Sequence, residues 1–160
     1  MEINTKFVQE SYVEMTQLVM PNDTNSQGVL FGGTLMKWID LAGAMVAMRH
    51  TRMDCVTVAL DNMDFHHSVR LNEIVTLKGK LTWTGNTSME IKIDVYAEEP
   101  YTGKTRLTNT AFMVLVAMDK DHNPAKVPGI KIISDNEKKE YDNAVKRREM
   151  RLMRKNNIPK

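Results

Sequence analysis

The sequence predicts an α+β fold in which a curled antiparallel sheet wraps around one long central helix. Three observations lead to this prediction. Residues 34–50 form a mostly apolar helical pattern. Several later segments alternate between apolar and polar residues, a period of two that is typical of half-buried antiparallel strands. A single sheet also needs an apolar element to cover its inner face. With 160 residues, the chain is long enough for one domain with a substantial core.

The part of the chain before this helix contains a strand and a loop. Residues 11–20 alternate loosely and are expected to form the first strand. Residues 21–28 (PNDTNSQG) are dense in turn-forming residues and predict a loop. Gly32 and Gly33 then precede the helix, which is apolar on nearly all sides and is therefore expected to be buried. One sheet cannot cover so many apolar sides, which predicts a partner subunit.

Four extended segments follow the helix. They cover residues 55–67, 73–85, 87–99 and 105–119. The third has the cleanest alternation, with apolar Met89, Ile91, Ile93, Val95 and Ala97 between polar neighbours. In the second, one face is expected to carry Val75, Leu77, Gly79, Leu81 and Trp83. Gly85 and Asn86 between these two segments signal a hairpin turn.

A basic helix is predicted at the end of the chain. Ser134 and Glu137 have the spacing of a capping box, which begins a helix that reaches about Lys155. Residues 137–155 contain eight Lys or Arg and four Asp or Glu, a local charge of +4 in a chain of net charge +2. The small overall charge gives no field that points to nucleic acid, although the basic segment could attract a phosphate-bearing partner.

Composition narrows the class of protein further. A single cysteine, Cys55, allows no internal disulfide, which fits a reducing compartment. The first 20 residues lack the apolar core of a signal peptide. No stretch approaches the roughly 18 apolar residues of a membrane span, so we expect a cytoplasmic protein without membrane insertion. The 13 methionines suit either a flexible core or an adaptable apolar pocket.

Asp40 is the first candidate for chemistry, because it is a carboxylate within the apolar helix. Burying an ionised carboxylate without a partner is costly. Lys37 lies three residues earlier, so Asp40 could belong to a narrow polar edge that is either solvated or paired with Lys37. Alternatively, this edge faces a wet cleft in which Asp40 acts as a general base or nucleophile. The spacing alone leaves both interpretations open.

Two weaker candidates lie before Asp40. Gly32 and Gly33 allow close approach of the backbone, and unpaired amides at a helix start can stabilise a developing oxyanion. A tight turn with positive φ is the alternative for the glycines. Asn25 could orient a water or hold a carbonyl group, or it could form a simple Asx turn.

The remaining candidates for a site are few. His66 and His67 are adjacent on or just after a strand, so they are expected to point to opposite faces. Cys55 and His50 offer no metal-ligand spacing with them, so no metal site is predicted. Nucleophile-elbow, phosphate-loop and dinucleotide motifs are also missing from the sequence.

Three segments resemble the hotdog-fold acyl-CoA thioesterases, a family that includes bacterial short-chain enzymes and brain-type acyl-CoA hydrolases. Residues 21–50 (PNDTNSQGVLFGGTLMKWIDLAGAMVAMRH) carry the matching loop Asn, Phe-Gly-Gly, the helix with WID, and A-x-R-H. Residues 56–69 resemble the segment that follows, and residues 84–98 resemble the strand pair that lines the coenzyme A site. We therefore expect a hotdog thioesterase domain at 8–120, followed by a linker and basic helix at 121–160.

The resemblance implies hydrolysis of acyl-CoA to a free acid and coenzyme A, as in fatty acid metabolism. It implies that Asp40 is the catalytic base or nucleophile, that Asn25 comes from the partner subunit, and that the Gly33 amide is the oxyanion donor. The implied substrate-binding residues are Gly32, Thr57, Asn86, Thr87 and Ser88. It also implies no cofactor beyond the coenzyme A of the substrate, and a homo-oligomer, a dimer at least and commonly a trimer of dimers.

The chain departs from this family in two places. Relatives often have PVxxGD where residues 68–73 read SVRLNE, but Asn72 tolerates left-handed geometry, so the turn is expected to survive. Residues 86–88 lack an arginine that in relatives can hold a phosphate of coenzyme A.

Two other functions are weighed against hydrolysis. One is a hotdog dehydratase or hydratase that recruits His66 or His67. The other is a non-catalytic regulator that binds acyl-CoA, or a nucleic-acid-binding module that uses the helix at 137–155.

Overall fold

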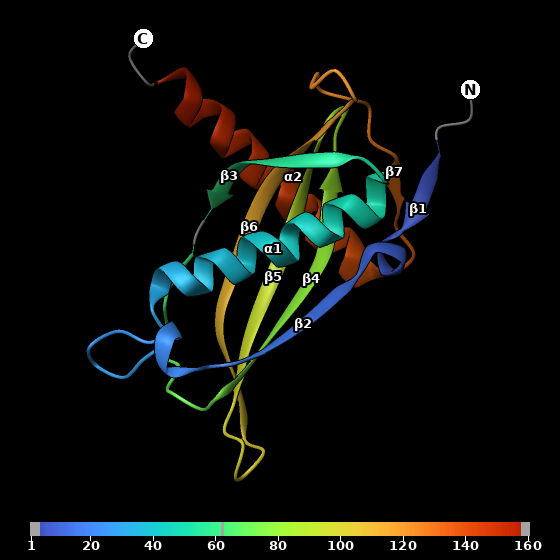
Figure 1. Ribbon diagram of the computed structural model, residues 1–160. Helices are drawn as coiled ribbons and strands as arrows, with labels where there is room; N and C mark the ends of the chain where they lie inside the picture. Colours follow the sequence, from blue (N-terminus) through green and yellow to red (C-terminus); the bar gives the residue numbers. More distant parts are fainter. Residues whose placement is uncertain (1–3, 62, 158–160) are drawn as a thin grey trace.

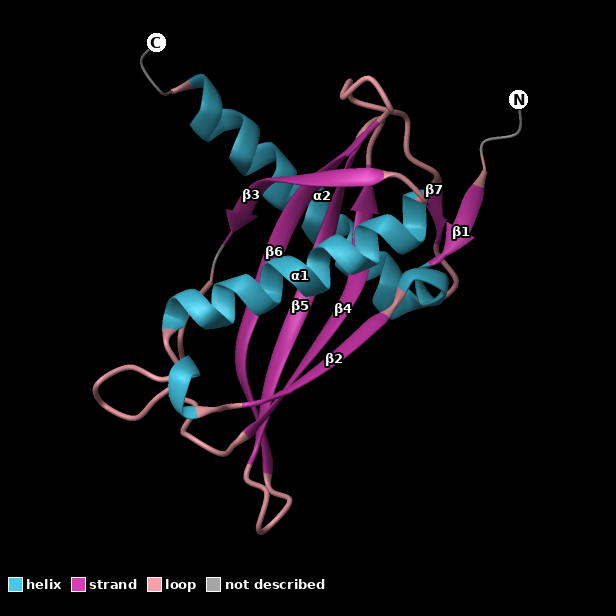
Figure 2. Ribbon diagram, viewed as in Figure 1, coloured by secondary structure: helices cyan, strands magenta, loops and turns pink. Residues whose placement is uncertain are grey.

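The computed structural model describes residues 4–61 and 63–157, in which a five-stranded antiparallel sheet curls around a long helix, α1 (Gly32–Thr51) (Figure 1). The order of strands across the sheet is β2 (Val13–Leu18), β4 (Ile74–Thr84), β5 (Ser88–Glu98), β6 (Thr105–Met118) and β3 (Asp54–Asp61). α1 crosses the concave face of this sheet (Figure 2). The predicted α+β fold with hotdog architecture is confirmed.

Helix α1 packs only one of its sides onto the sheet. Its buried apolar residues meet the inner face of the strands and include Leu35, Trp38, Ile39, Ala42, Val46 and Ala47. Its opposite side exposes apolar residues to solvent, namely Met36, Leu41, Met45 and Met48. The prediction of a fully buried helix is therefore wrong for the single chain, because one sheet covers one side. The helix also begins at Gly32, two residues before the predicted start, and ends at Arg52 in the left-handed conformation.

The central strands follow the predicted alternation with one exception. All five apolar residues of β5 predicted to face inward are fully buried. In β4, a bulge shifts the register, so that Leu81 pairs with Ile91 but Trp83 pairs with Glu90. Trp83 therefore joins the outer face, where the Arg148 guanidinium lies 5.2 Å from the centre of its ring. Its predicted place on the face of Leu81 is wrong because a one-residue bulge reverses the alternation.

Several local predictions can be compared with the strand ends and turns. β3 ends at Asp61, so His66 and His67 lie in a loop rather than on the predicted longer strand, and both are exposed. Asn72 has a φ of 68°, which confirms that it takes left-handed geometry in the turn. The amide of Gly85 donates to the Ser88 carbonyl at 2.8 Å, and this closes the predicted hairpin between β4 and β5.

The N-terminal strand pairs with the segment before α2 in a small second sheet that the sequence pattern did not predict. β1 (Thr5–Phe7) pairs in parallel with β7 (Gly129–Lys131). Two short 3-10 helices, η1 (Val8–Ser11) and η2 (Pro21–Asp23), flank β2. The expected division of the chain at residue 120 thus has backbone pairing across it.

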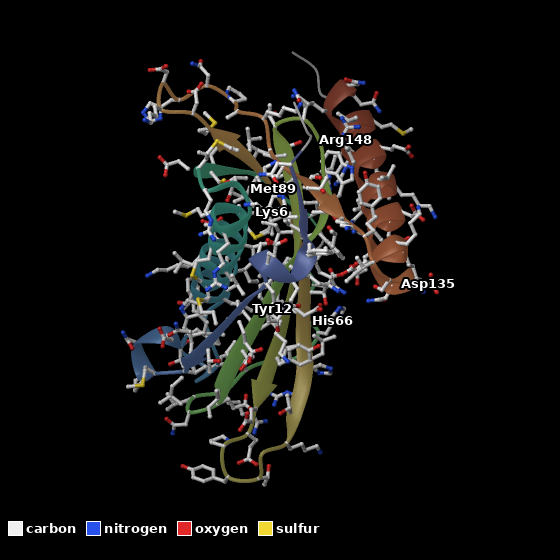
Figure 3. All side chains as sticks on the ribbon, turned by 90° about the vertical axis from the view of Figure 1, so that its right-hand side faces the viewer. Lys6, Tyr12, His66, Met89, Asp135 and Arg148 are labelled. Carbon is white, nitrogen blue, oxygen red and sulfur yellow. The ribbon has the colours of Figure 1, made fainter. Side chains whose placement is uncertain are left out.

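The predicted basic helix is α2 (Asp135–Asn156), and it begins as the capping box indicates. Ser134 Oγ accepts a hydrogen bond from the Glu137 amide at 3.2 Å, while the Glu137 carboxylate accepts one from the Ile133 amide. Figure 3 shows α1 and α2 on opposite sides of the sheet. Neither helix has the length and apolar character that crossing a membrane requires.

His50 joins the end of α1 to the segment before β7. It is fully buried, and its Nε2 lies 2.8 Å from the Pro128 carbonyl, so this nitrogen must carry the hydrogen. Its Nδ1 has no hydrogen-bond partner among the described residues. Burial lowers the pKa of His50 below its ordinary value of 6.5, because charging the ring would leave an uncompensated cation in the interior.

This environment predicts a loss of stability on acidification. As the pH falls below about 6.5, the unfolded chain binds a proton at His50 that the folded chain does not, so the free energy of unfolding decreases. The His50→Gln variant keeps an amide donor for Pro128 but does not titrate. We expect the melting temperature of the wild type to fall more steeply than that of the variant between about pH 7 and 5. Parallel curves by differential scanning calorimetry would contradict this assignment.

Candidate active site

The candidate site is centred on a contact between α1 and the edge strand β3. Thr57 Oγ1 of β3 donates a hydrogen bond to Asp40 Oδ1 at 2.7 Å. Both residues are exposed in the single chain. The carboxylate therefore has one oxygen held by a hydroxyl group, while the other is open to a water molecule or a substrate. Thr57 was predicted to bind substrate, and the structure shows that it contacts the carboxylate directly.

The structure bears on the Lys-paired interpretation of Asp40. Among the described residues, no ion pair joins Lys37 to Asp40 within 4.0 Å. The Lys-paired edge is therefore not formed. The carboxylate instead lies on an exposed apolar surface beside Leu41, which is the setting expected of a cleft that a second subunit closes.

Gly32 and Gly33 are the first two residues of α1, not a turn before it. Neither has a positive φ, so the alternative of a tight turn is wrong. A Cβ atom on Gly33 would lie only 2.6 Å from the Phe31 ring, and one on Gly32 would lie 3.4 Å from the Phe65 ring. The first amides of a helix have no acceptor within the helix, and the macrodipole adds partial positive charge there. This end of α1 is therefore suited to bind a developing negative charge.

Asn25 lies in a tightly closed loop before α1. Its Oδ1 accepts hydrogen bonds from the amides of Gln27 at 2.9 Å and Val29 at 3.4 Å, so the Asx turn is present. Gly28 completes the loop with a φ of 71°. Within the described part of the chain, Asn25 Nδ2 donates no hydrogen bond, and the residue is exposed. The turn thus holds the side chain still and leaves its amide nitrogen available to another molecule.

A groove lies toward the other end of α1, and we call it the methionine groove. Its apolar walls come from Met45, Met48, Met53 and Met118. Its volume of about 730 Å³ falls in the range of small-molecule sites. Asp40 and Met48 are eight residues apart on one side of the helix, so the groove continues the stripe that carries the carboxylate. The sequence showed the number of methionines, but only the fold gathers these four.

The residues predicted to contact coenzyme A lie in the turn between β4 and β5. The Asn86 carbonyl accepts from the Val127 amide at 2.9 Å, and the Thr87 carbonyl accepts from the Ala117 amide at 3.0 Å. Ser88 begins β5 and pairs with Val116. No hydrogen bond of the described residues joins this turn to Asp40. Val116 pairs in turn with Val56 of β3, so Ser88 lies two strands across the sheet from the neighbour of Thr57.

Other reactive side chains do not add to the site. Burial raises the pKa of the Cys55 thiol, which keeps it protonated and unreactive at neutral pH. His66 and His67 are exposed in the loop after β3 and make no hydrogen bond to Asp40 in the described structure. In residues 4–61 and 63–157, no group of three His, Cys, Asp or Glu side chains is placed to hold a metal ion.

Comparison with known proteins identifies relatives of this fold and site. The model of the thioesterase superfamily matches residues 27–104. An uncharacterized acyl-CoA thioester hydrolase of Bacillus subtilis (strain 168) is 37% identical over 151 residues, which cover 94% of this chain and 88% of the relative.

Solved structures agree with this likeness. An apo-hexameric acyl-CoA thioesterase matches with a TM-score of 0.93 and 35% identity, covering 98% of this chain and 100% of the other. An acyl-CoA hydrolase from Staphylococcus aureus, solved with butyryl coenzyme A, coenzyme A and coenzyme A disulfide, has a TM-score of 0.88 and 32% identity over 94% of this chain and 92% of its own. It was also solved with alanine in place of an asparagine, an aspartate or a threonine, at positions 28, 43 and 60 of that protein.

Proposed function

The chain belongs to the thioesterase superfamily and is an acyl-CoA thioester hydrolase, and on that basis we propose that Asp40 carries the reaction at a site shared by two subunits. The reaction uses water to cleave an acyl-CoA thioester into a carboxylic acid and coenzyme A. The observation that carries the proposal is the hydrogen bond from Thr57 to Asp40, which holds an accessible carboxylate two turns into a helix.

Asp40 can serve by either of two routes. As a general base, its free oxygen takes a proton from a water molecule while that water attacks the thioester carbonyl carbon, and the thiolate of coenzyme A then leaves. As a nucleophile, the same oxygen attacks the carbonyl carbon and forms a mixed anhydride, which water hydrolyses in a second step. In both routes Thr57 orients the carboxylate and leaves one oxygen to react.

The start of α1 supplies the complementary charge. The thioester oxygen gains negative charge as the carbonyl carbon becomes tetrahedral, and a positioned amide stabilises that charge. We assign this role to the Gly33 amide. We propose that Gly32, which has no side chain, lets the substrate approach the backbone closely. The protein needs no cofactor for this chemistry, because coenzyme A arrives as part of the substrate.

The exposed apolar surface around Asp40 supports a dimer. β3 is an edge strand with unpaired backbone groups, and it exposes the apolar side chains Val56, Val58 and Leu60. Uncovered edges of this kind are templates for pairing with another chain. We therefore propose that two copies join along β3 and α1. The hexameric state of a structural relative suggests that three such dimers assemble further.

Asn25 is proposed to reach the Asp40 of the neighbouring subunit. Its immobilised side chain has a free Nδ2, which can hold a water molecule or the substrate carbonyl. The intervals between Asn25, Asp40 and Thr57 equal those between the three positions replaced by alanine in the Staphylococcus aureus enzyme. That agreement supports a common site without defining the role of each residue.

The two ends of the substrate are assigned to different regions. The methionine groove suits the acyl chain, because thioether side chains adapt to flexible apolar ligands. We keep Asn86, Thr87 and Ser88 as proposed contacts of coenzyme A. A cytoplasmic location and a role in fatty acid metabolism belong to the same proposal.

The alternative functions find less support. A dehydratase needs a histidine beside the carboxylate, and neither His66 nor His67 contacts Asp40 in the described structure. The basic helix would need free cations to bind nucleic acid or to act as a regulator. Arg147 and Arg151 are paired with carboxylates of the sheet, which leaves fewer cations of α2 for such a partner.

Replacing Asp40 tests the central assignment. We expect the wild type to release coenzyme A from acyl-CoA substrates, and Asp40→Asn to lower kcat by about 10²-fold or more, the scale of a positioned acid–base group. Lys37→Gln on the preceding turn is the matched control and should retain activity. Release of thiol can be followed with a chromogenic thiol reagent. Full activity of Asp40→Asn would show that another group carries the reaction.

A mixing experiment tests the shared site. Asp40→Asn and Asn25→Ala are each expected to be inactive as homodimers. After unfolding and refolding together, half of the dimers are mixed, and each mixed dimer has one site with both native residues. Activity should therefore recover to about a quarter of the wild-type value if a two-fold axis relates the subunits. No recovery in a sample shown by native mass spectrometry to contain mixed dimers would place both residues in one chain.

The methionine groove predicts a selective effect on chain length. Met48→Trp fills the groove with a bulky ring, so kcat/KM should fall for long acyl-CoAs and change little for acetyl-CoA. A loss of about 10-fold or more is expected for long chains, since each methylene displaced from an apolar pocket has a cost of this order. Met153→Trp on the exposed end of α2 is the control. Equal losses of kcat/KM for every chain length would show that the acyl chain does not bind in this groove.

A further inference from the structure

The outer face of the sheet holds two carboxylates beneath α2, and they lie on strands that are not neighbours. Glu90 is on β5 and is 0% exposed, and Asp61 is at the end of β3 and is 8% exposed. β6 runs between these strands. A buried carboxylate requires charged or hydrogen-bonding partners, because an unpaired one is very costly. In both cases the charged partners come from α2.

Arg151 of α2 bridges the two carboxylates. Its Nη1 donates to Glu90 Oε2 at 2.9 Å and to Asp61 Oδ2 at 2.7 Å. Glu90 is held further by Thr82 Oγ1 and by Arg147 Nη2, each at 2.7 Å. Asp61 has a second and longer contact, 3.3 Å from the exposed Arg154. Arg151 thus ties the end of the edge strand to the centre of the sheet.

Asp61 and Thr57 lie on the same strand but point in opposite directions. Thr57 faces α1, where it donates to Asp40, and Asp61 faces α2 on the other side of the sheet, where it accepts from Arg151. Residues four apart in a regular strand would share a face. In β3 the register shifts, so that Thr57 pairs with Leu115 but Ala59 pairs with Val114. The extra residue, Val58, reverses the alternation, as a bulge does.

We propose that Arg151 is a positioning residue for the Asp40–Thr57 pair, a proposal that rests on the thioesterase function described above. β3 is hydrogen-bonded on one side only within the chain, and a slip of one residue would turn Thr57 away from α1. Arg151 prevents that slip by holding Asp61 on the outer face. With Asp61 held outward and the bulge between them, Thr57 must point inward to Asp40.

The basic helix thereby acquires a role in catalysis without contacting the substrate. Arg151 is the only described residue with hydrogen bonds to both Glu90 and Asp61. Beside it, the Arg147 guanidinium packs 3.7 Å from the centre of the Phe112 ring on the intervening strand β6. α2 therefore contacts β3, β5 and β6 through side chains, and β3 is the strand that carries Thr57.

The test is a double-mutant cycle with Arg151→Met and Thr57→Val. Arg151→Met should lower kcat by about 10- to 100-fold, the scale for a misplaced catalytic group, with a smaller change in KM. In the Thr57→Val background, the same substitution should change kcat less than about twofold, because the group it positions is already gone. Arg148→Met is the matched control, since Arg148 contacts the Trp83 ring and should leave kcat unchanged.

A second variant and a crystal structure provide further tests of the positioning role of Arg151. If Arg151→Met does not fold, Asp61→Asn removes only the charge on β3, and the same cycle applies to it. A crystal structure of either folded variant should show Thr57 Oγ1 more than about 3.5 Å from Asp40 Oδ1, beyond hydrogen-bonding distance. A folded variant with unchanged kcat, an equal loss in the Thr57→Val background, or an intact contact would each overturn the positioning role. Wild-type protein without hydrolysis would instead overturn the proposed function, and the structural readout would still decide the positioning role.

Discussion

A single constraint shapes this protein: α1 is apolar on more sides than its own sheet can cover. The inner side of the helix fills the sheet with residues such as Ile39 and Val46, which have no solvent exposure. Its outer side leaves Met36, Leu41, Met45 and Met48 exposed, with Asp40 among them. Covering that side with a second subunit removes apolar surface from water and also creates a sheltered cleft around a carboxylate. In the proposed dimer, assembly and catalysis therefore depend on the same face of the helix.

The position of Asp40 reconciles two requirements that conflict within one chain. A reactive carboxylate must remain ionised and accessible, yet it works best where bulk water is largely excluded. The single chain meets the first requirement with an exposed side chain and one hydrogen bond, from Thr57. In the proposed dimer, the second subunit meets the other requirement by covering the helix. Asn25 suits this arrangement, because its own loop holds the Oδ1 atom and leaves the Nδ2 atom for the neighbour.

Bulges distribute functions between the two faces of the sheet. One extra residue in β3 lets the same strand give Thr57 to α1 and Asp61 to α2, and one in β4 moves Trp83 to the outer face beneath Arg148. Helix α2 then binds the outer carboxylates through Arg147 and Arg151. The inner face is left to the core and the active site, and the outer face to charged contacts that hold the strands in register.

The sequence by itself determined the parts that depend on local periodicity and chemistry. The alternation of β5, the capping of α2 by Ser134, the left-handed Asn72 and the apolar α1 carrying Asp40 were all readable, because neighbours along the chain decide them. Residues 21–50 also identified the family. Only the tertiary structure decided the faces of Trp83 and Asp61, since a bulge reverses an alternation without any mark in the composition. It also decided the contact between Asp40 and Thr57, 17 residues apart, and the link from Arg151 to Asp61, 90 residues apart, because such contacts arise only when separate elements pack together.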